Sequence, residues 1–165
     1  MSKVLVLLYL MLPAYCANMA APFARFWPGW NRSINRKRLG EHKTVIGFGF
    51  GVLAALLVAW AQARIAWAGA LIDYAWWPLI GLAAGVGALG GDALKSWFKR
   101  ARGIAPGASW VPADQLDFVL GALLLLWPWA RWGWEDVAIV LAVSFVGDIA
   151  INHIAYWLRI RDTKW

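Results

Sequence analysis

The sequence predicts an all-α integral membrane protein whose single domain covers residues 1–165 and crosses the membrane five times. Three observations support this fold class. The chain is 62% apolar with a mean hydropathy of +0.57, which is more apolar surface than a soluble domain of 165 residues needs. Uncharged runs of membrane length recur along it, and its Lys and Arg residues are concentrated in alternate connecting segments.

Three uncharged runs occupy the first half of the chain, at residues 4–24, 44–63 and 74–91. Each has roughly the 20 residues that a helix needs to cross the hydrocarbon core. The first run follows Lys3, a pattern that also occurs in signal peptides. Because the run is long and no small-residue cleavage site precedes a soluble remainder, we expect a retained helix.

Two less regular runs complete the predicted set of five spans. Residues 118–130 form a short apolar run, which lengthens if the helix begins near Asp114 or continues to Trp134. Residues 137–158 are long enough to span but include several polar side chains. Such groups usually face the interior of a bundle or a polar cavity.

The basic residues predict the orientation. Of the 16 Lys and Arg residues, all but three lie in residues 25–43, residues 95–102 and the C-terminal tail, leaving Lys3, Arg64 and Arg131 for the other side. The positive-inside rule therefore places the N-terminus outside and the C-terminus in the cytoplasm of a multi-pass cell-membrane protein. This distribution and attraction to anionic lipid heads explain the net charge of +7 without a nucleic-acid partner.

Polar residues gather around the connection between the third and fourth predicted helices. If the third helix continues past Gly91, four polar side chains share one of its faces, at i, i+3, i+4 and i+7. These are Asp92, Lys95, Ser96 and Lys99. Asp114 and Asp117 have the i, i+3 spacing that places them on one face of the first turn of the next helix.

Two explanations fit this cluster of polar residues. The bases suit an ordinary positive-inside flank paired with Asp92, and acids in a first helical turn are favourable in themselves. Alternatively, the carboxylates bind Mg²⁺, a hard cation that prefers oxygen ligands, while the bases bind phosphate. The second explanation predicts a site for a metal–polyphosphate complex at the membrane–water boundary.

Three further polar residues lie within predicted spans. Asp148 and Asn152 have i, i+4 spacing on the last helix, and Asn18 is isolated in the first. Hydrogen bonding between helices explains each of them as well as a supporting role in a site does. Gly85, Gly87 and Gly90 match G-x-G-x-x-G, but inside a membrane span this pattern indicates close helix packing, not dinucleotide binding.

Two adjacent motifs resemble a known family. The chain has S-W-F-K-R at residues 96–100 and then D-Q-L-D at residues 114–117. This resembles the CTP-dependent cytidylyltransferases that activate phosphatidate-like lipids, and is most similar to their small five-helix branch, the CDP-archaeol synthases. Further matching segments are P-A-Y-C-A-N at 13–18, G-G-D-x-x-K-S at 90–96 and N-H-x-x-Y at 152–156. The H-G-G of the larger bacterial branch is absent.

The resemblance implies a transferase of phospholipid biosynthesis that makes a CDP-lipid and pyrophosphate from CTP and an unsaturated archaeal ether-lipid phosphate, 2,3-bis-O-geranylgeranylglycerol 1-phosphate. It implies that Mg²⁺ is held by Asp92, Asp114 and Asp117. Lys95, Lys99 and Arg100 would stabilise the leaving group. The residues expected to contact CTP or its phosphates are Lys43, Thr44, Ser96, Arg102 and Gln115.

Two other functions are alternatives. An ester lipid, phosphatidate, is the alternative substrate. Independently of the substrate, a homodimer is compatible with the sequence. A small oligomeric channel or transporter is the alternative class of protein. Its polar residues would line a path through the membrane, whereas those of this chain collect at the predicted cytoplasmic edge.

Overall fold

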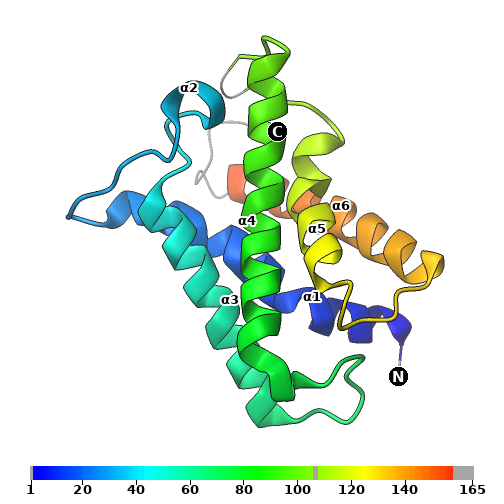
Figure 1. Cartoon of the computed structure of the whole chain (residues 1–165). Helices are drawn as coiled ribbons and strands as arrows, with labels where there is room; N and C mark the ends of the chain where they lie inside the picture. The colour runs from blue at the N-terminus through cyan, green and yellow to red at the C-terminus, as the bar shows by residue number, and fades with distance from the viewer. Residues whose placement is uncertain (1, 106–107, 158–165) are drawn as a thin grey trace.

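The computed structural model describes residues 2–105 and 108–157, which form an entirely helical fold (Figure 1). The elements in chain order are α1 (Lys3–Ala20), η1 (Ala21–Phe26), α2 (Arg36–Leu39), α3 (Val45–Ile65), η2 (Tyr74–Trp76), α4 (Trp77–Ala101), α5 (Ala113–Leu126) and α6 (Trp134–Trp157). The two η elements are short 3₁₀ helices. The all-α class predicted from the sequence is confirmed.

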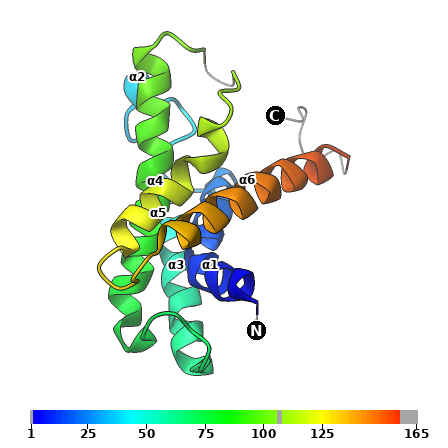
Figure 2. The same cartoon turned by 90° about the vertical axis from the view of Figure 1, so that its right-hand side faces the viewer.

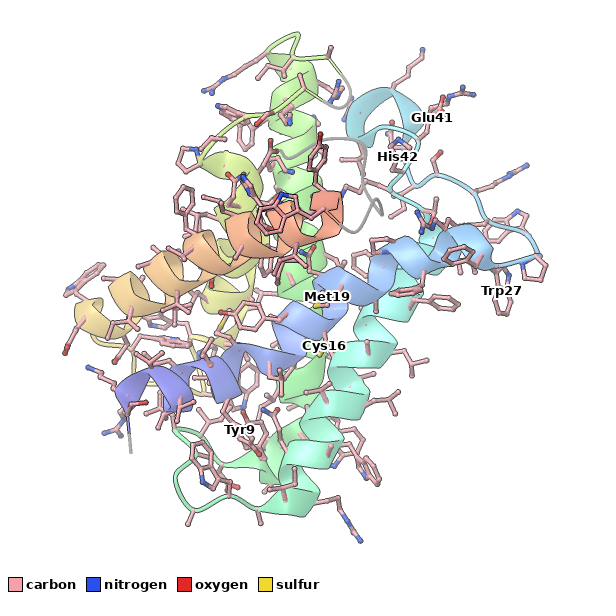
Figure 3. All side chains as sticks on the ribbon, turned by 180° about the vertical axis from the view of Figure 1, so that it is seen from behind. Tyr9, Cys16, Met19, Trp27, Glu41 and His42 are labelled. Atoms are coloured by element: carbon pink, nitrogen blue, oxygen red, sulfur yellow. The ribbon has the colours of Figure 1, made fainter. Side chains whose placement is uncertain are left out.

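Helix α4 is the centre of the bundle. It packs against α1, α3 and α5, while α6 contacts α5 and α1 but not α4 within the described part of the chain. Helices α1 and α6 run obliquely across the back of α4 (Figures 1 and 3). The second half of α6 extends away from the other helices (Figure 2). The bundle is therefore less tightly packed on the side of α6 than around α4.

The contact between α4 and α5 brings their backbones together. A Cβ atom added at Gly91 would overlap the backbone carbonyl of Asp117, and one at Gly121 would overlap the carbonyl of Gly87. Small residues at such positions let two helices approach closely. Gly85 faces α3, where an added Cβ would lie 3.1 Å from the Cα of Val52. The packing explanation is therefore confirmed for Gly85 and Gly87 but not for Gly90, where an added Cβ would have no neighbour within 4 Å.

Four segments are long and apolar enough to cross a membrane: Lys3–Phe26, Val45–Ile65, Tyr74–Ala101 and Trp134–Ile154. They correspond to four of the five predicted spans. Helix α5 has only 14 residues, or about 21 Å at 1.5 Å per residue. That is less than the hydrocarbon thickness of about 30 Å, so the fifth span remains a prediction.

The two ends of the bundle differ in charge. At one end Lys3 lies 2.6 Å from Glu135 and 2.9 Å from Asp136, which joins the starts of α1 and α6. At the other end α2 and the connection after α4 lie together, at the top of Figure 1. The basic segments 25–43 and 95–102 thus reach the same end of the molecule.

Candidate functional site

One ammonium group lies among three carboxylates where α4 meets α5. The Nζ atom of Lys95 is 3.4 Å from Asp92 Oδ1, 2.9 Å from Asp114 Oδ1 and 2.9 Å from Asp117 Oδ2. Asp92 and Lys95 share a face because α4 continues unbroken to Ala101, as the i, i+3 spacing predicts. The carboxylates come from two helices that backbone contact holds together.

The first turn of α5 supplies the two other acids. Helix α5 begins at Ala113, so Asp114 and Asp117 lie on the face that meets α4. Asp114 also accepts hydrogen bonds from Lys99 Nζ at 3.0 and 3.1 Å and from the Trp110 N–H at 2.6 Å. Burial opposes its ionisation, but the bonds from Lys95 and Trp110 hold the pKa of Asp114 below its usual range.

Asp117 is the most deeply buried acid of the cluster. Its side chain is 5% exposed, and burial raises its pKa to about 6 although Lys95 opposes that shift. Its Oδ1 atom accepts the N–H of Phe118, whereas Oδ2 makes no well-aligned hydrogen bond within the described structure. Its partner is the ammonium group of Lys95 at 2.9 Å, so a metal ion would have to take the place of that group.

The segment before α3 adds a third base. Lys43 forms an ion pair with Asp92, and the next residue, Thr44, caps α3 by accepting the Gly47 N–H at 3.1 Å. A backbone hydrogen bond of 2.8 Å from the Ile34 N–H to the Lys43 carbonyl fixes this segment. The structure thus brings Lys43, Lys95 and Lys99 to the same three acids, although Lys43 is 49 residues from Asp92 in the chain.

These groups lie on the wall of a cavity of about 820 Å³, a volume typical of small-ligand sites. Of the residues predicted for the site, the following line it: Asn18, Lys43, Thr44, Asp92, Lys95, Lys99, Asp114, Gln115, Asp148 and Asn152. Asn152 donates a hydrogen bond of 2.9 Å to Asp148. The wall therefore combines α1, α3, α4, α5 and α6, and it includes all three polar residues predicted to support the site.

Three predicted contact residues lie outside this wall, and so does Asp117, which is enclosed behind it. Arg100 donates to the Ile104 carbonyl at 2.6 Å, and Ser96 donates to the Asp92 carbonyl at 2.9 Å. Arg102 is exposed and stacks on Trp110, with its guanidinium carbon 5.2 Å from the ring centre. Since successive residues of a helix are about 100° apart, Arg100 points away from Lys99. Ser96 keeps the face predicted for it, but its hydroxyl is bonded to the backbone of α4 and not directed into the cavity.

The cavity also has polar residues that the sequence analysis did not select, namely Arg25, Asn31, Glu41, His42 and Ser109. Figure 3 labels Glu41 and His42 in the segment that follows α2, and Cys16 and Met19 on α1. The five lie in η1 and in connecting segments, where no helical periodicity relates them to the acids. In the sequence Glu41 and His42 directly precede Lys43 and Ser109 lies close to Asp114, but Arg25 and Asn31 have no such neighbour, and Arg25 indicates only the orientation.

The acids fit a hard divalent cation by their chemistry. They offer carboxylate oxygens, and the buried Oδ2 of Asp117 has only the ammonium group of Lys95 as a partner among the described residues. As the described side chains lie, no three His, Cys, Asp or Glu residues are grouped closely enough to hold a metal ion. The reason is that the three carboxylates surround Lys95, so its ammonium group stands where they converge.

Helices of membrane length around a cavity lined by clustered acids and lysines fit an intramembrane enzyme that acts on phosphorylated substrates. The whole chain, residues 1–165, matches the family described as CarS-like, CDP-archaeol synthase. The chain belongs to this family. It is accordingly a CTP-dependent cytidylyltransferase, and the resemblance noted in the sequence is confirmed.

Individual relatives agree. The CDP-archaeol synthase of Methanospirillum hungatei JF-1 is 35% identical over 169 residues, covering 94% of this chain and 100% of the relative. That of Methanopyrus kandleri is 34% identical over 166 residues, covering 96% and 91%. A solved structure described as an intramembrane enzyme for archaeal membrane lipids biosynthesis has a TM-score of 0.70 and 29% identity, covering 91% of this chain and 94% of its own.

Proposed function

We propose that the chain transfers CMP from CTP to the phosphate of an unsaturated archaeal ether lipid, with the residues around Lys95 as its active site. An oxygen of the lipid phosphate attacks the α-phosphorus of CTP, forming a new O–P bond. The bond from the α-phosphorus to the bridging oxygen breaks, and pyrophosphate leaves. No general base is needed, because a phosphate monoester is already an anion at neutral pH. Three lysines and two acids, Asp92 and Asp114, line one cavity, and the third acid, Asp117, is paired with Lys95 behind its wall, which supports this assignment.

The lysines counter the repulsion between the two anionic substrates. In the structure Lys43, Lys95 and Lys99 are paired with carboxylates. We infer that they exchange these partners for phosphate oxygens when CTP is bound, which stabilises charge on the pyrophosphate leaving group. Arg100 and Arg102 keep the end of α4 and the following connection in place. Thr44 and Asn18 remain candidate hydrogen-bonding groups at the cavity wall.

The proposal includes Mg²⁺ bound by Asp92, Asp114 and Asp117. When bound, the ion neutralises phosphate charge and aligns the reacting oxygens. For the acids to hold it, Lys95 must withdraw from their centre toward the substrate phosphates, as the proposed partner exchange requires.

The proposed membrane arrangement has five spans, with the N-terminus outside and the cavity facing the cytoplasm, where CTP is found. The short α5 would cross as the fifth span, entering at the basic end of the bundle where Asp114 meets Lys99. The lipid would enter sideways between α1 and α6, since both helices contribute to the cavity wall and α6 extends away from α4 (Figure 2).

The test is turnover of labelled CTP by purified protein with Mg²⁺ and a panel of lipid phosphates. The panel contains an unsaturated digeranylgeranyl ether, its saturated counterpart and an ester phosphatidate. We expect CDP-lipid formation with a preference for the unsaturated ether. Equal use of the ester lipid would contradict the proposed preference for the ether lipid. If no member of the panel gave a CDP-lipid, the proposed function would be rejected.

A further inference from the structure

One neutral side chain on the cavity wall has an unsatisfied polar atom. Gln115, in the first turn of α5, is only 3% exposed and lines the cavity. Its side-chain oxygen Oε1 is buried and has no hydrogen-bond partner among the described residues. A buried acceptor left without a donor costs free energy, so such a group in a binding cavity indicates a ligand that supplies the donor.

The chemistry of the atom limits what the ligand can be. The orphan atom is an acceptor, and an ionised phosphate offers only acceptors, so phosphate cannot satisfy it. In CTP the hydrogen donors are the exocyclic amine of cytosine and the ribose hydroxyls. Gln115 directly follows Asp114, which pairs with Lys95 and Lys99, and it lines the same cavity as these lysines, to which the phosphates are assigned.

We propose that Gln115 recognises the base of CTP, its Oε1 accepting a hydrogen bond from the exocyclic amine of cytosine. The amide Nε2 group can donate to the neighbouring ring nitrogen, which is an acceptor in cytosine and a donor in uracil. The residue then acts in substrate specificity, distinguishing CTP from UTP. This inference rests on the proposed function, since it assumes that the phosphates of CTP lie at Lys95.

The chain provides a matched control, Gln62 of α3. It is also buried, 2% exposed, and its Oε1 also lacks a well-aligned hydrogen bond. Its Nε2, however, donates to the Tyr9 carbonyl at 2.5 Å, and its amide interacts with the Tyr74 hydroxyl. Gln62 does not line the cavity. Replacing it tests the loss of a buried glutamine without touching a nucleotide site.

The experiment pairs a change in the protein with a change in the nucleotide. Wild type, Gln115→Met and Gln62→Met are assayed with CTP, UTP, 2′-deoxy-CTP and the pyrimidin-2-one ribonucleoside triphosphate, which is CTP without its amine. We expect Gln115→Met to raise KM for CTP about tenfold or more and to lower the CTP-over-UTP ratio of kcat/KM similarly. Removing the amine should cost wild type a comparable factor but cost Gln115→Met almost nothing, because the two changes remove one interaction.

A preference for CTP that Gln115→Met leaves unchanged would overturn the proposal, and so would a change only in the ratio of CTP to 2′-deoxy-CTP, which would place a ribose hydroxyl at Gln115. A loss of discrimination in Gln62→Met would make the effect structural. If Gln115→Met does not fold, wild type alone decides, because equal use of the amine-free nucleotide contradicts recognition of the amine. Failure of wild type with every nucleotide and lipid instead rejects the proposed function.

Discussion

The backbone carbonyl of Asp117 lies directly against Gly91, so closely that a single methyl group at residue 91 would overlap it. The next residue of α4 is Asp92, and the Asp117 side chain lies 2.9 Å from Lys95. The distance between the two helix backbones therefore sets the spacing between the acids and the lysine of the site.

We expect Gly91→Ala to reduce turnover at least tenfold, because the methyl group pushes α5 away from α4 and separates Asp117 from Lys95. The control is Gly90→Ala, since a Cβ atom there has no neighbour within 4 Å. Turnover and thermal unfolding in detergent are measured for both variants. Equal turnover in the two would show that the α4–α5 contact does not position the site.

Lysines within the cluster should matter far more than bases outside it. Lys95→Ala and Lys99→Ala are expected to lower kcat by about 10²–10³, the usual cost of losing a contact to developing charge. Arg36→Ala should cost severalfold or less, since Arg36 is exposed and paired with Glu41. Arg102→Ala should behave similarly because Arg102 stacks on Trp110. The four variants are compared at matched expression in detergent. Similar small losses in all of them would show that the lysines of the cluster serve only as a positive-inside flank.

The metal prediction concerns Asp117, whose buried Oδ2 atom has Lys95 as its ion-pair partner in the structure. A chelator should abolish activity, and Mg²⁺ but not Na⁺ should restore it. Asp117→Asn removes the charge while keeping the shape, so turnover should fall by orders of magnitude while the protein stays folded. Trp fluorescence measures whether the variant is folded. Full activity of this variant would exclude Asp117 as a metal ligand.

Protons should compete with the metal at Asp117, whose pKa is raised by burial to about 6. Above pH 6 the group is mostly ionised and can bind a cation once Lys95 withdraws. Below pH 6 it is increasingly protonated, so the Mg²⁺ concentration for half-maximal rate should rise by up to about tenfold per pH unit. Mg²⁺ titrations at pH 5, 6 and 7 measure this effect. A requirement that stays constant across the series would contradict it.

The orientation can be tested by labelling single cysteines in a Cys16→Ser background. Cysteines at Arg36 and Arg102 should be protected from a membrane-impermeant reagent applied from outside, whereas one at Asp73 should react. All three positions are exposed on the protein, so protection would come from the membrane and not from burial. The reverse pattern would place the cavity outside and remove its access to cytoplasmic CTP.

Much of this protein follows from its sequence alone, because helix periodicity and the cost of unpaired polar groups in lipid act locally. The apolar runs at residues 4–24, 44–63 and 74–91 correspond to three of the long helices. The i, i+3 spacings of Asp92 with Lys95 and of Asp114 with Asp117 correctly placed each pair on one helical face. The S-x-x-K-R and D-x-x-D segments also indicated the family that the comparisons confirmed.

Only the tertiary structure decided which of these residues meet. Lys43 reaches Asp92 across 49 residues because a loop is fixed against α3 by backbone bonds that no side-chain pattern encodes. Arg100 has the same charge and nearly the same position as Lys99, yet one residue of helical rotation turns it from the cavity to the Ile104 carbonyl. Gly91 can approach the backbone of Asp117 because neither Gly91 on α4 nor Gly121 on α5 carries a side chain. Spacing along one helix fixes a face, but contact between helices depends on distances that packing alone sets.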